Sequence, residues 1–301
     1  MTNIFFKLIS KLQSLVKKIF FLIYYIILLF DKIIHLIFRK RILYWFKEFF
    51  EKDSYKKKNI LGRDIIFFTP NEITDWRINT FFTKEPETLE WIDSFKGEKI
   101  VFWDIGANIG LYSLYAAIKH PNIEIVSFEP SVNNLRILSR NIYKNNFFKQ
   151  IKIFQLPLSE QENTFSNMNE MEFIEGWSMS TFGESKDFEG SIFKPNHAYK
   201  LFGTNINYLL DKKILKFPNY IKIDVDGIEH LILRGGIELF KNPKILEIQI
   251  EINENYFDEN NNVLKIMDEC LFKFKEKKRN GLSGYYKTKR LSKIYNYYFT
   301  R

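Results

Sequence analysis

The stretch Ile100-Val101-Phe102-Trp103-Asp104-Ile105-Gly106-Ala107-Asn108-Ile109-Gly110 decides the fold of this chain. It begins with apolar residues typical of a buried strand and reaches an acid at Asp104. A turn with two glycines follows, and residues 111–119 have the pattern of a helix. A helix that begins directly after a strand points free backbone N–H groups at a ligand, so the stretch predicts a nucleotide-type site with Asp104 at the polar end of the bound molecule. The alternative is a doubly wound fold in which the turn serves packing alone.

Strands and helices continue to alternate after this stretch. Pro130 ends a second expected strand, and Ser131 is expected to cap the helix that follows. Strands are expected at 64–68, 123–129, 151–158, 219–225, 244–253, 272–278 and 294–299, and further helices at 88–95, 131–145, 228–240 and 262–271. This alternation predicts an α/β fold with a mostly parallel sheet, in which the last two strands are antiparallel.

Acidic residues stand where several of these strands end. Glu129 ends the strand next to that of Asp104, where a carboxylate can accept hydrogen bonds from both hydroxyls of a ribose. Asp224 and Asp226 place two more carboxylates at the same edge, at which open α/β sheets bind ligands. Residues 156–159 (Leu-Pro-Leu-Ser), at the end of the third strand, could line an adenine pocket.

Two other segments are interpreted from their position in the alternation. Glu85 and Glu87 precede the helix expected at 88–95, and both are interpreted as helix-start residues because acids stabilise the start of a helix. Residues 160–200 are polar, contain glycine and show no periodic pattern. An irregular insertion of this length is a candidate for a lid over the substrate.

The net charge of +9 lies entirely in the first 60 residues, which carry 13 basic and 4 acidic side chains. Basic and acidic residues balance in the rest of the chain. A nucleic-acid-binding domain would carry its positive charge on the folded body, so this distribution argues against nucleic acid as a partner.

The N-terminal segment combines this charge with apolar residues. Residues 19–30 form an uncharged run of twelve, whereas a spanning helix needs about 20 apolar residues. Extending the run to Phe38 would bury Asp31 and Lys32, at about 2.5–3.5 kcal/mol each at mid-membrane. Residues 1–50 are therefore expected to form one or two amphipathic helices on an anionic membrane surface, with residues 39–41 (Arg-Lys-Arg) facing the headgroups. The main alternative is a helical cap packed on the protein or on a second subunit.

Cysteine and histidine usage limits the chemistry. The single Cys270 cannot pair within the chain, and the four histidines are widely separated without metal-ligand spacing. The single cysteine excludes a thiol-rich zinc site and suits a reducing compartment such as the cytoplasm, and each histidine is interpreted as a surface or packing residue rather than a ligand. The expected organisation is a basic segment at 1–59 followed by a catalytic domain at 60–301, cytoplasmic or peripheral at the inner face of a membrane.

The motif at residues 104–110 resembles the first motif of S-adenosylmethionine-dependent methyltransferases. Its Ala107-Asn108 pair is similar to the variant of the FkbM family. Further stretches resemble that family in the same order: 85–88 (EPET), 127–130 (SFEP), 222–229 (KIDVDGIE), 246–249 (LEIQ) and 295–299 (YNYYF). The resemblance runs from about residue 64 to residue 300 and leaves the first 60 residues outside.

The resemblance implies a Rossmann-like, seven-stranded, mostly parallel sheet with an antiparallel last strand, and methyl transfer, usually to oxygen. It also implies the residues that would bind S-adenosylmethionine. Asp104, Gly106, Ala107, Asn108 and Gly110 would hold the methionine part, Glu129 with Pro130 the ribose, Leu158 and Ser159 the adenine, and Asp224 would lie beside the sulfur. Asp226 replaces the usual Glu of the family, which keeps the charge and shortens its reach.

The expected reaction is an in-line displacement in which Asp224 or Asp226 accepts the proton of an attacking hydroxyl. Alternatively, the two carboxylates bind a divalent cation that lowers the pKa of the hydroxyl. The basic N-terminal segment suggests a glycan, a lipid-linked sugar or another small molecule at the cytoplasmic face as the methyl acceptor. Two other classes stay open: a nicotinamide-dependent oxidoreductase, although the turn lacks G-x-G-x-x-G, and a non-catalytic, membrane-tethered binding module.

Overall fold

The computed structural model describes residues 2–186, 190–279 and 293–301, and the side chains from residue 8 onward. The chain divides into two units, Met1–Tyr55 and Lys56–Arg301, close to the boundary expected after residue 59. Each unit is described by itself.

The first unit consists of two helices. α1 (Thr2–Phe38) is one uninterrupted helix of 37 residues, and α2 (Leu43–Asp53) follows after a short turn. Asp31 is fully buried, and its carboxylate accepts hydrogen bonds from Arg41 Nε (2.6 Å) and from the backbone N–H of Leu43 (3.1 Å). These bonds connect the turn to α1. The helix is also longer than the apolar run of twelve residues suggests: between Leu8 and Phe38 its length and apolar composition would allow it to cross a membrane.

The second unit begins with a hairpin and two short helices. β1 (Tyr55–Ile60) and β2 (Arg63–Phe68) pair into a two-stranded sheet, and α3 (Glu72–Asn79) and α4 (Pro86–Asp93) follow. Leu61 and Gly62 both have positive φ, as a tight hairpin turn requires. Neither β1 nor α3 was expected from the sequence. The run Lys56-Lys57-Lys58 gave β1 no alternation of apolar and polar residues.

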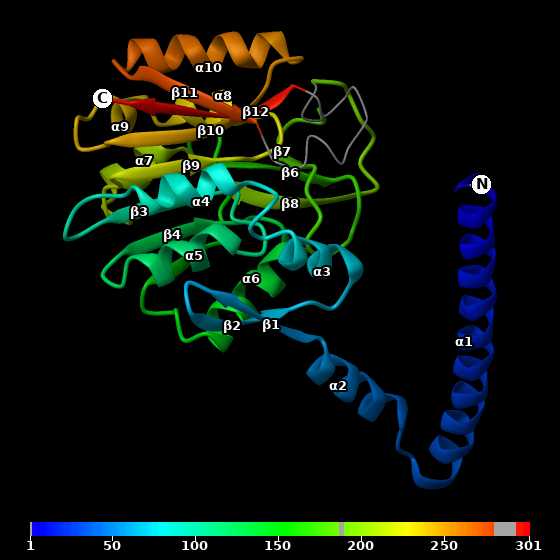
Figure 1. The fold of residues 1–301 in the computed structure, drawn as a ribbon. Coiled ribbons are helices and arrows are strands. Elements are labelled where there is room, and N and C mark those ends of the chain that lie inside the picture. The colour runs from blue at the N-terminus through cyan, green and yellow to red at the C-terminus, as the bar shows by residue number, and fades with distance from the viewer. Residues whose placement is uncertain (1, 187–189, 280–292) are drawn as a thin grey trace. The chain divides into compact units, whose positions relative to one another are not determined.

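The central sheet has seven strands in the order β11-β12-β10-β9-β3-β4-β5 (Figure 1). Their bounds are β3 Val101–Ile105, β4 Glu124–Phe128, β5 Ile151–Phe154, β9 Tyr220–Ile223, β10 Glu247–Asn253, β11 Lys273–Arg279 and β12 Ile294–Thr300. The five neighbouring strands β10, β9, β3, β4 and β5 are parallel to one another, whereas β12 is antiparallel to both β10 and β11. This arrangement confirms the expected fold, including its antiparallel last strand.

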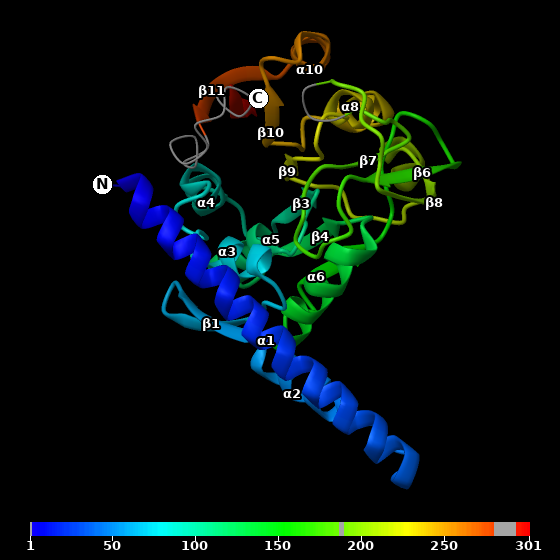
Figure 2. The ribbon, with the colours of Figure 1, turned by 90° about the vertical axis from the view of Figure 1, so that its right-hand side faces the viewer.

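Helices cover both faces of this sheet. In Figure 2, α4 and α5 lie on one side of the strands, and α8 and α10 lie on the other. The bounds of the remaining helices are α5 Leu111–Lys119, α6 Val132–Lys144, α7 Ile206–Asp211, α8 Glu229–Gly235, α9 Ile237–Phe240 and α10 Phe257–Glu269. The single helix expected at 228–240 is therefore two, divided at Gly236, and the one expected at 262–271 begins earlier, at Phe257. The central strands are buried on both faces by these helices, which explains why they read as continuous apolar runs.

The described part of the insertion between β5 and β9 contains three strands. β6 (Thr164–Glu170), β7 (Ser180–Phe182) and β8 (His197–Gly203) form a three-stranded antiparallel sheet, so the expectation of an irregular segment at 160–200 is wrong. Strand β6 has the sequence TFSNMNE, in which polar residues occupy both faces. Such a strand gives almost no apolar alternation, because its buried Asn169 and Glu170 are satisfied by hydrogen bonds rather than by apolar packing.

Candidate functional site

A cavity of about 620 Å³ lies at the C-terminal ends of β3, β4 and β9. Its wall contains seven of the residues expected from the sequence: Gly106, Asn108, Glu129, Pro130, Leu158, Asp224 and Asp226. Four others, Asp104, Ala107, Gly110 and Ser159, are not part of the wall. The parallel strands thus bring together residues that are more than 100 positions apart in sequence.

The turn after β3 depends on its glycines. Gly106 has φ +85°, and a Cβ at this position would lie 1.8 Å from the backbone oxygen of Asp224. Gly110 has φ +86° and would place a Cβ 2.5 Å from Leu138 Cδ1. Any larger residue at 106 would collide with backbone that cannot rotate away, so this glycine lets the turn approach the end of β9.

Asp104 lies behind the wall rather than in it. Its side chain is fully buried and accepts a hydrogen bond from Ser113 Oγ (2.6 Å), which also contacts Ser127 Oγ (2.7 Å). Burial raises the pKa of Asp104, and Lys222 opposes that effect. Asp104 therefore connects β3 to α5 and β4, and its expected contact with the methionine part of a cofactor stays a prediction.

Glu129 joins the two turns at the ends of β3 and β4. Its carboxylate accepts hydrogen bonds from the backbone N–H groups of Asn108 (2.7 Å) and Ser131 (2.9 Å). Burial raises the pKa of Glu129 to about 8. Ser131 was expected to cap α6, but its side chain makes no capping hydrogen bond. Its hydroxyl donates instead to Glu170 of the insertion (2.6 Å).

The expected adenine segment lies beyond the end of β5, which stops at Phe154. Leu158 forms an isolated bridge with Thr204, and it lines the cavity together with Leu156 and Pro157. The hydroxyl of Ser159 faces Gln161, with which it exchanges local hydrogen bonds. This part of the cavity is consequently apolar, as a pocket for a flat heterocycle would be.

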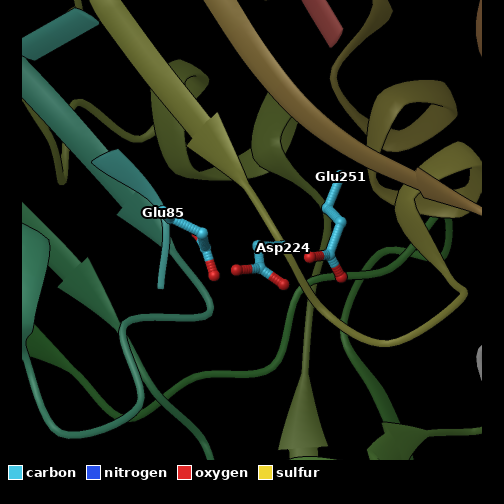
Figure 3. A group of neighbouring side chains, drawn as sticks. All are labelled: Glu85, Asp224 and Glu251. Carbon is cyan, nitrogen blue, oxygen red and sulfur yellow. The ribbon is translucent and has the colours of Figure 1, made fainter. Parts of the chain in front are cut away.

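A group of three carboxylates lies at another part of the cavity, where Asp224 and Glu251 line the wall and Glu85 is buried beside them. Oxygen atoms of Glu85, Asp224 and Glu251 lie within 4.8 Å of one another. In Figure 3 the three side chains point toward a common centre, with Asp224 between the other two. Glu85 does precede α4, but its side chain makes no capping hydrogen bond to that helix and turns toward Asp224 instead. The interpretation of Glu85 as a helix-start residue alone is therefore incomplete.

Two lysines neutralise part of this group. Lys222 is only 1% exposed, and its Nζ lies 2.7 Å from Asp224 Oδ2, while Lys84 pairs with Glu85. Burial alone would raise the pKa of Asp224, but the charges of Lys222 and Lys84 lower it below its ordinary value. Asp224 is thus held as a carboxylate. The donor atoms of the group would suit a cation, yet two of the three carboxylates already have an ammonium partner.

Asp226 faces the insertion rather than this group. Its carboxylate accepts hydrogen bonds from the backbone N–H groups of Met179 (2.7 Å) and Ser180 (3.4 Å). Burial and the charge of Asp224 raise the pKa of Asp226 to about 6. The expected cation site formed by Asp224 and Asp226 does not agree with this arrangement, because Asp226 is not among the converging carboxylates.

The segment 175–180 of the insertion is bound tightly at the cavity. Asn108 Nδ2 and Asn134 Nδ2 both donate to the backbone oxygen of Trp177 (3.0 Å each), and Arg77 Nε donates to that of Gly176 (2.6 Å). Residues 176–180 line the cavity. Whether this segment opens as a lid stays a prediction, but the insertion does contribute to the wall.

Sequence reasoning missed Lys84, Glu251 and Arg77 as cavity residues. A usable signal existed for Glu251, because Glu247, Gln249 and Glu251 alternate in a strand that is otherwise apolar. Polar side chains that recur every second residue of a central strand need polar partners or a cavity. Arg77 lies in α3, and Lys84 lies just before α4. Nothing in the sequence connects either residue to the edge of the sheet.

Comparison with known proteins identifies the family. The model of the methyltransferase FkbM domain matches residues 104–274, which is more than half of the chain. Methyltransferase sdnD from Sordaria araneosa is 43% identical over 61 residues, 20% of this chain and 24% of that protein. The antimetabolite synthetase AmbE from Pseudomonas aeruginosa is 41% identical over 68 residues, 22% of this chain and 3% of that protein. The chain thus spans a quarter or less of these curated relatives.

Solved structures of methyltransferases are similar to this chain at low sequence identity. A methyltransferase FkbM from Methylobacillus flagellatus is 16% identical, with a TM-score of 0.43, over 75% of this chain and 55% of that one. A precorrin-6y C5,15-methyltransferase from Geobacter metallireducens is 13% identical, with a TM-score of 0.42, over 72% and 86% of the two chains. The family assignment rests on the match to residues 104–274: this chain belongs to the FkbM methyltransferase family.

Proposed function

We propose that the protein transfers a methyl group from S-adenosylmethionine to a hydroxyl oxygen. The observation that carries this proposal is the single cavity in which the Gly106 turn, Glu129 and Asp224 meet at the ends of three neighbouring strands. The family supports methyl transfer in general, and the geometry supports the donor. The oxygen acceptor is inferred from the carboxylates, which can accept a proton from a hydroxyl.

The residues of the cavity fit this donor. Gly106 allows the backbone to approach a ligand closely, and Glu129 offers a carboxylate to a ribose. Buried polar atoms in the wall, Asn108 Oδ1 and Trp177 Nε1, have no hydrogen-bond partner within the described part of the chain, so a polar ligand would satisfy them. Asp224 is held as a carboxylate, which suits a position beside the positively charged sulfonium. When bound, the donor supplies an electrophilic methyl group.

The methyl acceptor that we propose is a hydroxyl of a glycan, a lipid-linked sugar or another polar small molecule. Trp76 offers a flat apolar face in the cavity wall, and Arg77 with Asp224 and Glu251 offers hydrogen-bonding groups nearby. Such a mixture of one aromatic surface and several charged groups suits a ring that carries many hydroxyls. The proposal uses no metal ion, because Lys84 and Lys222 already neutralise two of the three carboxylates.

We further propose that α1 associates with a membrane. Its side chains from residue 8 to residue 38 are almost all exposed and mostly apolar, and basic residues stand on both sides of the uncharged run 19–30. Exposed apolar side chains on this scale require a lipid or protein surface to cover them. The basic flanks favour anionic lipid over a neutral one. A membrane would also be the place to meet a lipid-linked acceptor.

A calorimetric titration tests the donor directly. We expect the full-length protein to bind S-adenosylhomocysteine and not NAD. Gly106→Ala should abolish this binding, because the added Cβ would collide with the backbone oxygen of Asp224. The matched control is Gly62→Ala, which imposes the same strain of a positive φ but meets no atom within 4 Å. Tighter binding of NAD, or no binding of S-adenosylhomocysteine by the wild type, would contradict the proposal.

A further inference from the structure

Glu251 differs in its surroundings from its neighbours Glu85 and Asp224. It lies in β10 between the buried Ile250 and Ile252, and its carboxylate points toward Asp224 and Glu85 (Figure 3). In the register of the sheet its neighbour on β12 is Asn296, which carries no charge. Within the described ranges, the Glu251 carboxylate makes no hydrogen bond and no ion pair, although it lines the cavity.

Four other acids at or beside the cavity already have partners. Asp224 pairs with Lys222, Glu85 pairs with Lys84, and Asp226 accepts the backbone N–H of Met179. Glu129 accepts hydrogen bonds from the backbone N–H groups of Asn108 and Ser131. A general base must have a free lone pair that can reach the substrate proton. Among these five carboxylates, Glu251 alone has neither a hydrogen-bond donor nor an ion-pair partner in the described part of the chain, so both of its oxygens are open to a substrate proton.

We propose that Glu251 is the group that accepts the proton of the acceptor hydroxyl, and that Asp224 serves the donor instead of acting as the base. This inference rests on the proposed function and deepens it. The hydroxyl oxygen forms the new O–C bond while the C–S bond of the donor breaks. The electron pair of that bond stays on sulfur, which gives neutral S-adenosylhomocysteine, and the hydroxyl proton passes to the Glu251 carboxylate and then to solvent.

The electrostatics of the cavity agree with this division of roles. Burial raises the pKa of Glu251 well above its ordinary value, and the charges of Asp224 and Glu85 add to that rise. Lys84 opposes it, and Asp226 adds to it. A carboxylate with a raised pKa is the stronger proton acceptor once it is ionised, whereas the lowered pKa of Asp224 makes Asp224 a poor one. The positive charge of a bound sulfonium would favour the ionised form of Glu251.

The decisive variant is Glu251→Gln, which keeps the shape of the side chain and removes the base. We expect its affinity for S-adenosylhomocysteine to stay within about threefold of wild type, while methyl transfer falls by about 10²–10⁴-fold. Transfer is followed with methyl-tritiated S-adenosylmethionine and a glycolipid extract of cells that lack the gene. The matched control is Glu247→Gln, which changes the same residue type on the same strand outside the cavity wall. It should leave both quantities unchanged.

Infrared spectroscopy gives a readout that does not depend on an acceptor. Apart from any contribution of Glu129, whose pKa is also raised, the carboxylic-acid C=O stretching bands of the wild type should lose intensity when S-adenosylmethionine binds. That intensity change should vanish in Glu251→Gln and persist in Glu247→Gln. Persistence of the change in Glu251→Gln, or its loss in Asp224→Asn alone, would overturn the assignment.

The outcomes separate this inference from the proposed function. If the wild type fails to bind S-adenosylhomocysteine, the proposed function is wrong and the role of Glu251 falls with it. If binding is normal but Glu251→Gln retains at least half of the wild-type transfer, only the assignment of the base is wrong. If Glu251→Gln loses affinity for S-adenosylhomocysteine, Glu251 holds the donor and is not the base.

Discussion

At the scale of single residues, the cavity concentrates carboxylates whose protonation depends on their burial. Glu129 is 4% exposed, and its pKa of about 8 lies well above that of an unfolded glutamate. Asp224 lines the same cavity with a lowered pKa, because the charges of Lys222 and Lys84 outweigh its burial. Residues of similar chemistry therefore acquire different charges from their neighbours alone.

Glu129 should make the folded state less stable as the pH rises. The folded protein holds the Glu129 proton up to about pH 8, whereas the unfolded chain releases it near the ordinary value of about 4.5. Between these values the folded state binds more protons, so its free energy of unfolding should fall as pH rises through this window. Replacing Glu129 with Gln should remove about 2–4 kcal/mol of that fall.

Urea unfolding of the wild type and the variant at pH 5 and pH 8 measures this difference. The exposed Glu98→Gln serves as the control and should leave the pH dependence unchanged. Equal slopes with pH for Glu129→Gln and wild type would show that Glu129 is not protonated in the folded protein.

At the scale of secondary-structure elements, the three-stranded sheet of the insertion is connected to the cavity through one acid. Asp226 has φ +63° and accepts the N–H groups that begin β7. Asp226→Ala should leave those donors without an acceptor and strain the backbone, at about 1–3 kcal/mol. We therefore expect amide hydrogen exchange of residues 178–182 to accelerate about tenfold or more, measured by mass spectrometry on the full chain.

Asp226→Asn is the matched control for this prediction. Asparagine tolerates a positive φ and keeps one acceptor oxygen, so exchange at 178–182 should stay close to that of the wild type. If Asp226→Ala exchanges as slowly as Asp226→Asn, the hydrogen bonds to Met179 and Ser180 do not hold the segment.

Some of these elements could be predicted from the sequence, and others could not. The strands that lead to Asp104, Glu129 and Asp224 were predictable, because each is a mostly apolar run with an acid at its end. Strand β6 was not, since its buried polar residues are satisfied by partners that lie far away in sequence. The group of Glu85, Asp224 and Glu251 could not be predicted for a related reason. Its members come from a helix start and two strands, and only the folded sheet brings them within 4.8 Å.

At the scale of the whole molecule, the proposed membrane association can be measured with vesicles. We expect the full-length protein to sediment with vesicles that contain anionic phosphatidylglycerol. Phe20→Asp places a charge in the apolar run of α1 and should weaken this binding at least tenfold, because a charged residue costs about 2.5–3.5 kcal/mol at mid-membrane. The matched control is Tyr143→Asp in the second unit, where an aromatic side chain is similarly exposed (72% against 66%). Equal sedimentation of wild type and Phe20→Asp would contradict the role of α1.

The basic strand β11 would affect how molecules of this protein contact one another on a membrane surface. It stands at one end of the sheet order and carries Lys273, Lys275, Lys277, Lys278 and Arg279. An outermost strand offers unpaired backbone groups to any neighbouring chain, and molecules crowded on a membrane meet edge to edge more often than in solution. Two adjoining β11 strands would bring rows of like charges together, so their repulsion should discourage sheet-to-sheet aggregation.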